Sequence, residues 1–203
     1  MNDNHELSDI ERCLKSEPTN TELLLTASRH YHRLAMEGDE EALAKGTSLV
    51  KRLLKIERGN VEALSIYGSL LTIRATKARS IISKIAYAIR ASRALDKAIR
   101  LDSDNTTART IRGFTSLVLP RFLRRLKFAV LDFEYLIERK RNEPSSLPEE
   151  MMPKIYFNLG VAYAKKGELN QARRVLSEVV SLFPETRECQ RAKFLLSRIG
   201  DGT

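Results

Sequence analysis

The chain has 203 residues, of which 42% are hydrophobic, so it can bury a sizeable core and is not an extended disordered segment. Nine Gly, six Pro and no Trp leave little turn chemistry for a many-stranded sheet, and helix-forming residues dominate, which favours an all-α fold. The 35 basic and 26 acidic residues give a net charge of +9, which permits anionic partners but does not determine the fold.

The N-terminal residues and the cysteines predict a cytoplasmic protein. The opening MNDNHE is polar and acidic, unlike an export signal, and no stretch approaches about 18 uninterrupted apolar residues, so we expect no membrane span. Cys13 and Cys189 lie near opposite ends and lack the paired spacing of disulfide frameworks or zinc sites, which fits a reducing compartment.

Apolar residues at helical spacing predict the first elements. We expect one helix within residues 1–17 and two helices within 19–59, separated by a turn at MEGDEE. Residues 60–105 contain the helical segment VEALSIYGSLL and then a stripe with spacings of 4, 3, 3, 4 and 3, which predicts one continuous helix to about Leu101. That stripe consists of Ile81, Ile85, Ala88, Ala91, Leu95 and Ala98.

The second half of the chain continues the helical pattern. Residues 106–141 predict two helices with an irregular turn around Pro120, and the polar stretch 142–152 predicts a linker. Residues 153–186 hold two apolar-periodic segments, broken at Gly167 and closed by Pro184, which predict a helix, a tight turn and a second helix. A final helix is expected at 187–199.

The segment 153–186 resembles the tetratricopeptide repeat. Small residues such as Gly160 and Ala172 let two antiparallel helices approach closely, and larger side chains fill the seam between them. With Gly160 at the family's small position, the other matching residues are Tyr156, Leu159, Tyr163, Gly167, Ala172, Leu176, Val179 and Pro184. Upstream, Gly68 and Gly113 take the same small position.

The resemblance implies an all-α, right-handed superhelical stack of about four tetratricopeptide-like hairpins, of the bacterial type with elongated helices. Gly68 and Ala91 are 23 residues apart where Gly160 and Ala172 are 12 apart, and an insertion of 11 residues keeps a helix in register. We therefore expect an elongated second helix. The single domain 1–203 would comprise repeats at 19–59, 60–105, 106–141 and 153–186, with caps at 1–17 and 187–199 and the linker at 142–152.

Two arginines depart from the family pattern. Arg109 and Arg112 fall where the family usually buries apolar side chains. An unpaired buried guanidinium is costly, so we expect this helix to be rotated and both side chains exposed. The alternative is that the two arginines line a cavity and face an acidic group.

No motif predicts catalysis, a cofactor or a metal ion. His30 and His32 are two residues apart and point in different directions on a helix, so they do not form the i, i+4 pair of a helical metal site. There is also no Gly-rich phosphate loop, no nucleophile elbow and no Cys–His pair with an orienting acid. We therefore predict a protein that is not an enzyme.

The first hypothesis is a non-catalytic adaptor or scaffold. The resemblance implies a concave groove, lined by the first helix of each repeat, that holds a peptide or helix of a partner protein. The candidate groove residues are Lys154, Phe157, Asn158, Val161, Thr110 and Phe114. On this hypothesis, changing Phe157 and Asn158 abolishes partner capture and leaves the melting temperature unchanged.

Uneven charge supports a second hypothesis, binding of nucleic acid or another polyanion. Residues 1–44 carry 4 basic and 10 acidic residues, whereas 74–141 carry 17 basic and 6 acidic residues. The candidate residues are Arg79, Arg90, Arg93, Lys97, Arg100, Arg121, Arg124, Arg125 and Lys127. Solvated surfaces, or contacts with the acidic end of another copy in a homo-oligomer, explain the same pattern. A third and less favoured hypothesis is a ligand-binding protein like the tetratricopeptide proteins associated with TRAP-type transporters, which are as a rule exported.

Overall fold

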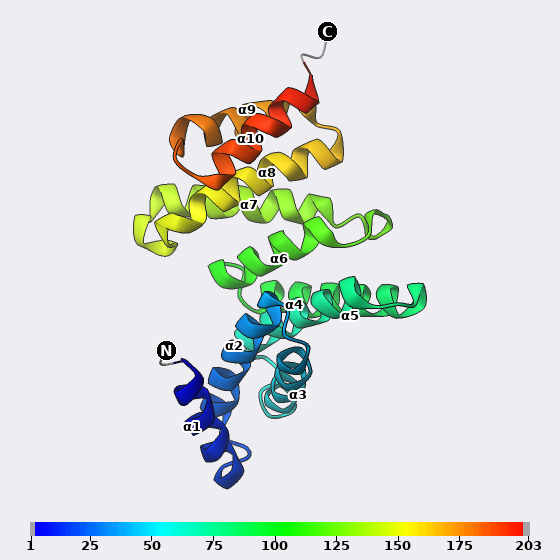
Figure 1. Ribbon diagram of the computed structural model, residues 1–203, viewed down its shortest axis with the longest axis vertical. Coiled ribbons are helices and arrows are strands. Elements are labelled where there is room, and N and C mark those ends of the chain that lie inside the picture. Colours follow the sequence, from blue (N-terminus) through cyan, green and yellow to red (C-terminus); the bar gives the residue numbers. More distant parts are fainter. Residues whose placement is uncertain (1–2, 201–203) are drawn as a thin grey trace. The chain divides into compact units, whose positions relative to one another are not determined.

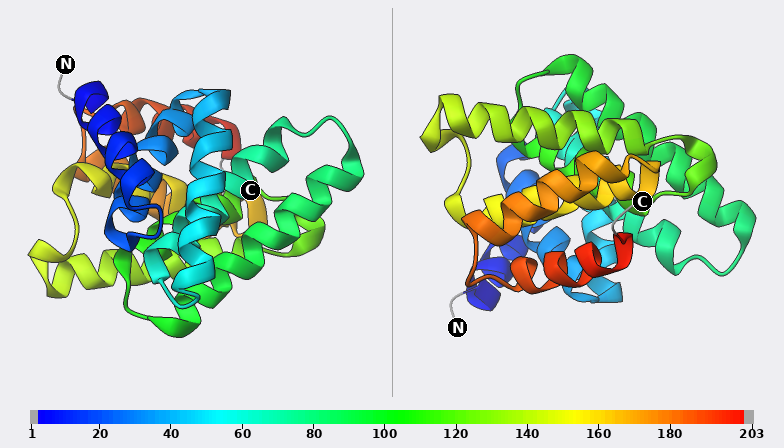
Figure 2. Two further views of the ribbon diagram at one scale, coloured as in Figure 1. Left: turned by 90° about the horizontal axis from the view of Figure 1, so that it is seen from below. Right: turned by 90° about the horizontal axis from the view of Figure 1, so that it is seen from above.

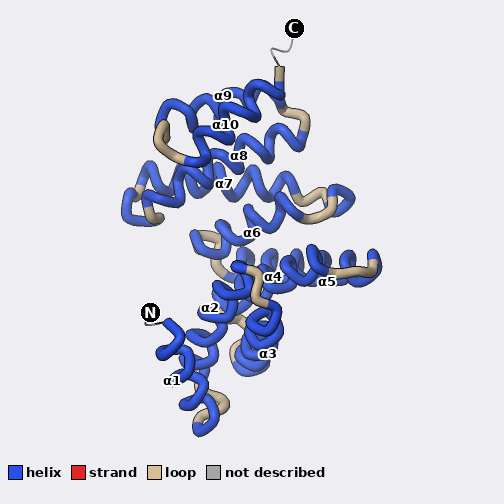
Figure 3. Tube along the Cα trace, viewed as in Figure 1, coloured by secondary structure: helices blue, strands red, loops and turns tan. Residues whose placement is uncertain are grey.

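The computed structural model describes the backbone of residues 3–200 and the side chains of residues 7–200. These residues form ten α-helices and three short 3₁₀-helices and no strand, which confirms the all-α prediction (Figures 1 and 3). The chain divides into two compact units, an N-terminal unit (Met1–Ile111) and a C-terminal unit (Arg112–Thr203), with the boundary inside α6 (Thr106–Val118). Residues 1 and 2 of the predicted first cap lie outside the described part.

The N-terminal unit contains one single helix and two helical hairpins. Helix α1 packs against α2, α2 pairs with α3, α3 contacts α4, and α4 pairs with α5. The bounds are α1 (Asp3–Ser16), α2 (Thr21–Glu37), α3 (Glu40–Ile56), α4 (Val61–Lys77) and α5 (Ile81–Leu101).

Capping residues determine where α2, α3 and α4 begin. The side-chain oxygens of Asn20, Asp39 and Asn60 accept hydrogen bonds from backbone N–H groups three residues on, at 3.1, 2.9 and 2.9 Å. Each satisfies a donor that the first helical turn leaves unpaired. Gly38 ends α2 in the left-handed region, with a φ of 110°, and so permits the tight turn into α3.

Glycines bring paired helices together. A Cβ on Gly68 would lie 2.5 Å from Leu95 Cγ, so the close contact between α4 and α5 requires a residue without a side chain. The same relation holds in the C-terminal unit, where a Cβ on Gly113 would lie 2.8 Å from the ring of Phe133, and one on Gly160 would lie 2.7 Å from Leu176. All three predicted small positions therefore face a large side chain.

Helix α5 is longer than the other second helices and ends at Leu101, as its apolar spacing predicts. Its beginning is different from the prediction, because Ile81 is 75% exposed and the buried stripe starts only at Ala88. The reason is the unequal length of the two helices. The two helices cross at Gly68 and Leu95. Nine residues of α4 follow Gly68, whereas fourteen residues of α5 precede Leu95 on the same side of the crossing. The start of α5, about 7 Å of helix, therefore extends beyond the end of α4.

The C-terminal unit stacks four helices that follow the end of α6. Helix α7 packs on α8, α8 pairs with α9, and α10 contacts both α8 and α9 (Figure 2). Their bounds are α7 (Leu126–Asn142), α8 (Met152–Lys166), α9 (Leu169–Leu182) and α10 (Arg187–Ile199). The 3₁₀-helices Arg121–Leu123, Pro144–Ser146 and Glu149–Met151 lie in the connections.

Arg112 overturns the prediction of a rotated helix. The contact of Gly113 with Phe133 keeps α6 in the family register, and Arg112 is only 7% exposed. Its Nε and Nη2 donate to the fully buried carboxylate of Asp132 at 2.7 and 2.8 Å. The alternative, a cation facing an acidic group, is correct for this residue. Arg109 is half-buried, and its Nε donates to the carbonyl oxygen of Ser103 at 2.7 Å.

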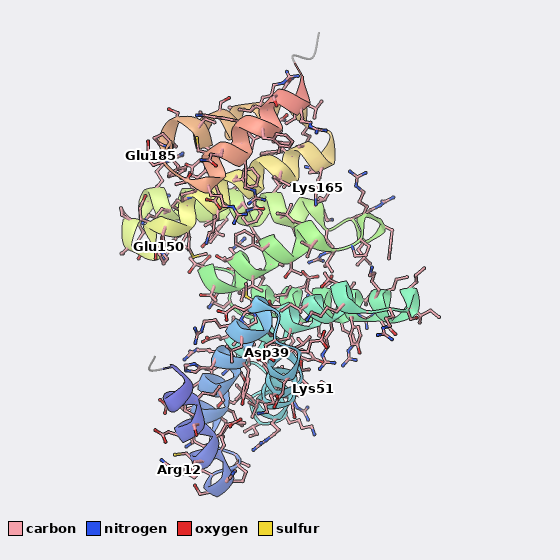
Figure 4. The ribbon with its side chains drawn as sticks, viewed as in Figure 1. Arg12, Asp39, Lys51, Glu150, Lys165 and Glu185 are labelled. Carbon is pink, nitrogen blue, oxygen red and sulfur yellow. The ribbon has the colours of Figure 1, made fainter. Side chains whose placement is uncertain are left out.

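The buried pair makes a stability prediction. Replacing Asp132 with Ala leaves the Arg112 guanidinium charged, buried and without its carboxylate, so Asp132→Ala should lower the free energy of unfolding by about 3–5 kcal/mol in urea titrations. The matched control is Glu150→Ala, an exposed carboxylate (Figure 4), which should change it by no more than about 0.5 kcal/mol. Equal stabilities of the two variants would contradict the role of the pair.

Candidate functional site

A groove between α7, α8 and α9 in the C-terminal unit encloses about 590 Å³. We refer to it as the tyrosine groove, because three of its lining residues are tyrosines. The lining residues are Glu134, Tyr135, Ile137, Glu138, Arg141, Tyr156, Leu159, Tyr163, Arg174, Val175 and Glu178.

The lining of this groove combines the hydrogen-bonding groups of Tyr, Glu and Arg with apolar side chains. The hydroxyl of Tyr163 donates to the carboxylate of Glu134. Burial, and then this hydrogen bond, raise the pKa of Tyr163 above its ordinary value, so the phenol stays protonated at neutral pH. The ring of Tyr156 lies 5.5 Å from that of Phe183, which holds it at the groove.

The rim of the tyrosine groove carries charges of both signs. Glu134, Glu138 and Glu178 are acidic, and Arg141 and Arg174 are basic. Arg141 Nη1 lies 3.3 Å from the carboxylate of Glu138. An apolar floor with donors and acceptors around it is the usual chemistry of a binding pocket.

Phe157, the main apolar residue of the predicted peptide groove, is not available on the surface. It is 4% exposed and packs with Leu176, Val179 and Ala192, and the guanidinium of Arg191 lies 4.3 Å from its ring centre. Helix α10 therefore covers the phenyl ring. A prediction based on α8 alone could not include this contact, because it depends on where the last helix packs.

The other predicted groove residues are separated by the fold. Lys154 is exposed and Asn158 half-buried, and Asn158 Nδ2 donates to the Lys154 carbonyl oxygen at 2.8 Å. Val161 is half-buried on the same helix. Thr110, in the N-terminal unit, donates to the carbonyl oxygen of Thr106 at 2.7 Å, and Phe114, in the C-terminal unit, makes an edge contact with Phe133.

The predicted basic residues of the N-terminal unit have different environments. The sequence predicts Arg79 on one face of the long helix with the other four basic residues, but Arg79 lies in the turn before α5. Arg90 donates to the hydroxyl of Tyr67 at 2.8 Å, and Lys97 donates to the carbonyl oxygen of Arg58 at 2.6 Å. The remaining two, Arg93 and Arg100, are exposed on α5.

The predicted basic residues of the C-terminal unit also differ from one another. Arg125 is 8% exposed, and its guanidinium lies 4.0 Å from the ring centre of Phe128, so it is part of the packing. The ammonium of Lys127 lies 5.0 Å from the same ring. Arg121 and Arg124 are exposed, and Arg124 adopts a left-handed backbone with a φ of 51°.

The described residues contain neither clustered metal ligands nor a helix able to span a membrane. They contain no group of three or more His, Cys, Asp or Glu residues that could hold a metal ion. His32 Nε2 lies 2.7 Å from Ser69 Oγ, and burial lowers the pKa of this imidazole. No helix in the described part of the chain is both long and apolar enough to cross a bilayer.

Comparison with known proteins agrees with this geometry. Residues 153–186 match the family described as "Tetratricopeptide repeat". Among solved structures, the thermophilic protein TTC0263 of Thermus thermophilus is 16% identical, with a TM-score of 0.66 over 97% of this chain and 90% of that chain. MamA is 20% identical, with a TM-score of 0.60 over 89% and 82%. No curated protein is similar enough in sequence to count as a match.

A further similar structure is YrrB, described as "a TPR protein with an unusual peptide-binding site". It is 17% identical, with a TM-score of 0.61 over 94% of this chain and 83% of that chain. The fold is thus that of an all-α helical repeat. Residues 153–186, which form α8 and α9, match the tetratricopeptide repeat, and the described chain has a fold similar to those of solved tetratricopeptide-repeat proteins.

The burial of Phe157 leads to a prediction opposite to the one made from the sequence. Phe157→Ala removes a ring from a closed cluster, so it should lower the free energy of unfolding by about 3–5 kcal/mol and lower the melting temperature. The neighbouring change Asn158→Ala, which removes one local hydrogen bond, should cost about 1 kcal/mol or less. Thermal and urea denaturation of both variants measure this difference, and an unchanged melting temperature for Phe157→Ala would refute the packing.

Proposed function

We propose that this protein is a non-catalytic interaction module that binds an extended peptide or a helix of a partner protein. The tetratricopeptide fold supports a role in protein interaction, and the peptide-binding site of YrrB gives a precedent on a similar fold. The tyrosine groove links this proposal to particular residues of the chain.

The groove has the composition of a peptide-binding surface. Tyrosine and arginine side chains dominate the binding energy of many protein interfaces, because they combine a large contact area with hydrogen-bonding groups. Here the half-buried rings of Tyr135 and Tyr156, which lie beside the buried floor of the groove, would contact an apolar side chain. The charged rim would hydrogen-bond the N–H and C=O groups of the bound backbone.

The exposed face of α8 is the alternative peptide site. Lys154 and Asn158 lie one helical turn apart there, and Asn158 Nδ2 donates to the Lys154 carbonyl oxygen. That face lacks its expected apolar anchor, because Phe157 is buried under α10. A surface without an anchor contributes little binding energy, so the tyrosine groove is the better candidate.

Polyanion binding is the second candidate function. It draws support from the exposed cations Arg93, Arg100, Arg121 and Arg124. Against it, Arg125 is buried and packed on Phe128, which reduces the number of cations that can contact phosphates.

Binding of a peptide selected from a random display library tests the proposal. The double variant Glu138→Lys with Arg174→Glu keeps the net charge and exchanges the two signs on the rim, so it should weaken the Kd of the selected peptide about tenfold. The matched control, Lys154→Ala with Asn158→Ala, should bind like the unchanged protein. Melting temperatures of both variants verify that the fold is retained.

Two results would overturn this assignment. Loss of binding in the Lys154 and Asn158 variant alone would move the peptide site to the exposed face of α8. No selected peptide, combined with binding of a labelled single-stranded DNA whose affinity falls steeply with salt, would favour the polyanion function.

A further inference from the structure

The N-terminal unit has a second groove with a different character. Two adjoining cavities of about 340 and 290 Å³ open along α3, the end of α4 and the start of α5, and they share Ala44 and Arg74 as lining residues. We call this feature the basic groove. Its basic lining residues are Lys51, Arg52, Lys55, Arg74, Lys77 and Arg79.

The positive charge of the basic groove is largely uncompensated. Its one acidic lining residue, Glu40, already lies 3.3 Å from Lys77 Nζ. Within the part of the chain that the structure describes, the exposed side chains of Lys51 (Figure 4), Lys55 and Arg79 make no hydrogen bond or ion pair. Several cations close together repel one another, and an anionic partner relieves this repulsion.

Two of the cations are fixed at the groove by their own chain. Arg74 Nε donates to Thr47 Oγ1 at 3.3 Å, and Arg52 Nη2 donates to the carbonyl oxygen of Pro18. Guanidinium groups held in this way lose less conformational entropy when they bind a carboxylate, and they keep donors free for it.

The tyrosine groove provides an internal comparison. It also lies where one hairpin meets the next, yet it is lined by three carboxylates and two guanidinium groups. The fold alone therefore does not produce a groove with six cations and one carboxylate. The charge of the basic groove is specific to the sequence of α3, α4 and the turn that follows α4.

The surroundings of the basic groove favour a peptide over a nucleic acid. Its apolar floor includes Leu43 and Ala44, and Ile81 and Ile82 stand 75% and 81% exposed two and three residues after Arg79. Single-stranded nucleic acids are held by several stacking aromatic rings, and Tyr87 is the one aromatic residue that lines the two cavities. We infer that the basic groove binds an acidic segment of a partner protein, one that carries several Asp or Glu residues and a few apolar side chains.

Fluorescence anisotropy with the full chain tests this inference. The probe is a fluorescein-labelled Glu-rich peptide with two Leu residues, and the matched probe has Gln in place of each Glu. The unchanged protein should bind the Glu peptide and not the Gln peptide. Lys51→Glu with Lys55→Glu should weaken the Kd by about tenfold or more. Arg93→Glu with Arg100→Glu, an equal change in charge on exposed α5 positions, should weaken it less than threefold, roughly the effect of screened surface charge.

Three outcomes would overturn the inference. An equal loss of affinity in the Lys51 and Lys55 variant and in the Arg93 and Arg100 variant would show that the peptide is attracted by net charge alone. Similar binding of the Glu and Gln peptides would exclude recognition of carboxylates. Tighter binding of a single-stranded DNA of equal charge, lost in the Lys51 and Lys55 variant, would assign the groove to nucleic acid. The double variant of Glu138 and Arg174, which alters the tyrosine groove, should bind the Glu peptide with unchanged affinity. The test of the basic groove is therefore independent of the test of the tyrosine groove.

Discussion

The close approach of two helices at a glycine is the constraint on which three helix pairs of this fold depend. A large side chain from the second helix occupies the space that a Cβ on the first would need, and this sets both the distance and the register of the pair. The three pairs are Gly68 with Leu95, Gly113 with Phe133, and Gly160 with Leu176. Because register decides which side chains of a hairpin face its neighbour, the contact of Gly68 with Leu95 fixes the α4 and α5 side of the basic groove, and the contact of Gly160 with Leu176 fixes the α8 and α9 side of the tyrosine groove.

The pair of Arg112 and Asp132 adds a polar constraint to one of these seams. Two ions leave water when they are buried, and their attraction offsets that cost only when the geometry is good. Here the guanidinium meets the carboxylate with two hydrogen bonds and lies 5.0 Å from the ring centre of Phe128. A shift of α6 along α7 would separate the charges, so the pair opposes alternative registers that an apolar seam would tolerate.

Local patterns predicted most of the fold and little of the candidate sites. Helical periodicity is a property of neighbouring residues, which is why the end of α5 at Leu101 followed from the sequence. The small positions at the crossings followed from the resemblance to the tetratricopeptide repeat. The exposure of Ile81 depends on the unequal lengths of α4 and α5, and the burial of Phe157 depends on α10. The tyrosine groove combines residues of three helices, and the only local signal was the seven-residue spacing of Tyr156 and Tyr163.

Grooves between successive hairpins are a natural place for this fold to acquire specificity. Residues at the glycine crossings are held by packing, whereas the exposed positions beside them can change charge at little cost in stability. One such groove in this chain is rich in tyrosine and carries mixed charges, and the other is basic. Electrostatic complementarity discriminates between partners more than it adds affinity, so under the two proposals above the grooves would select segments of different charge.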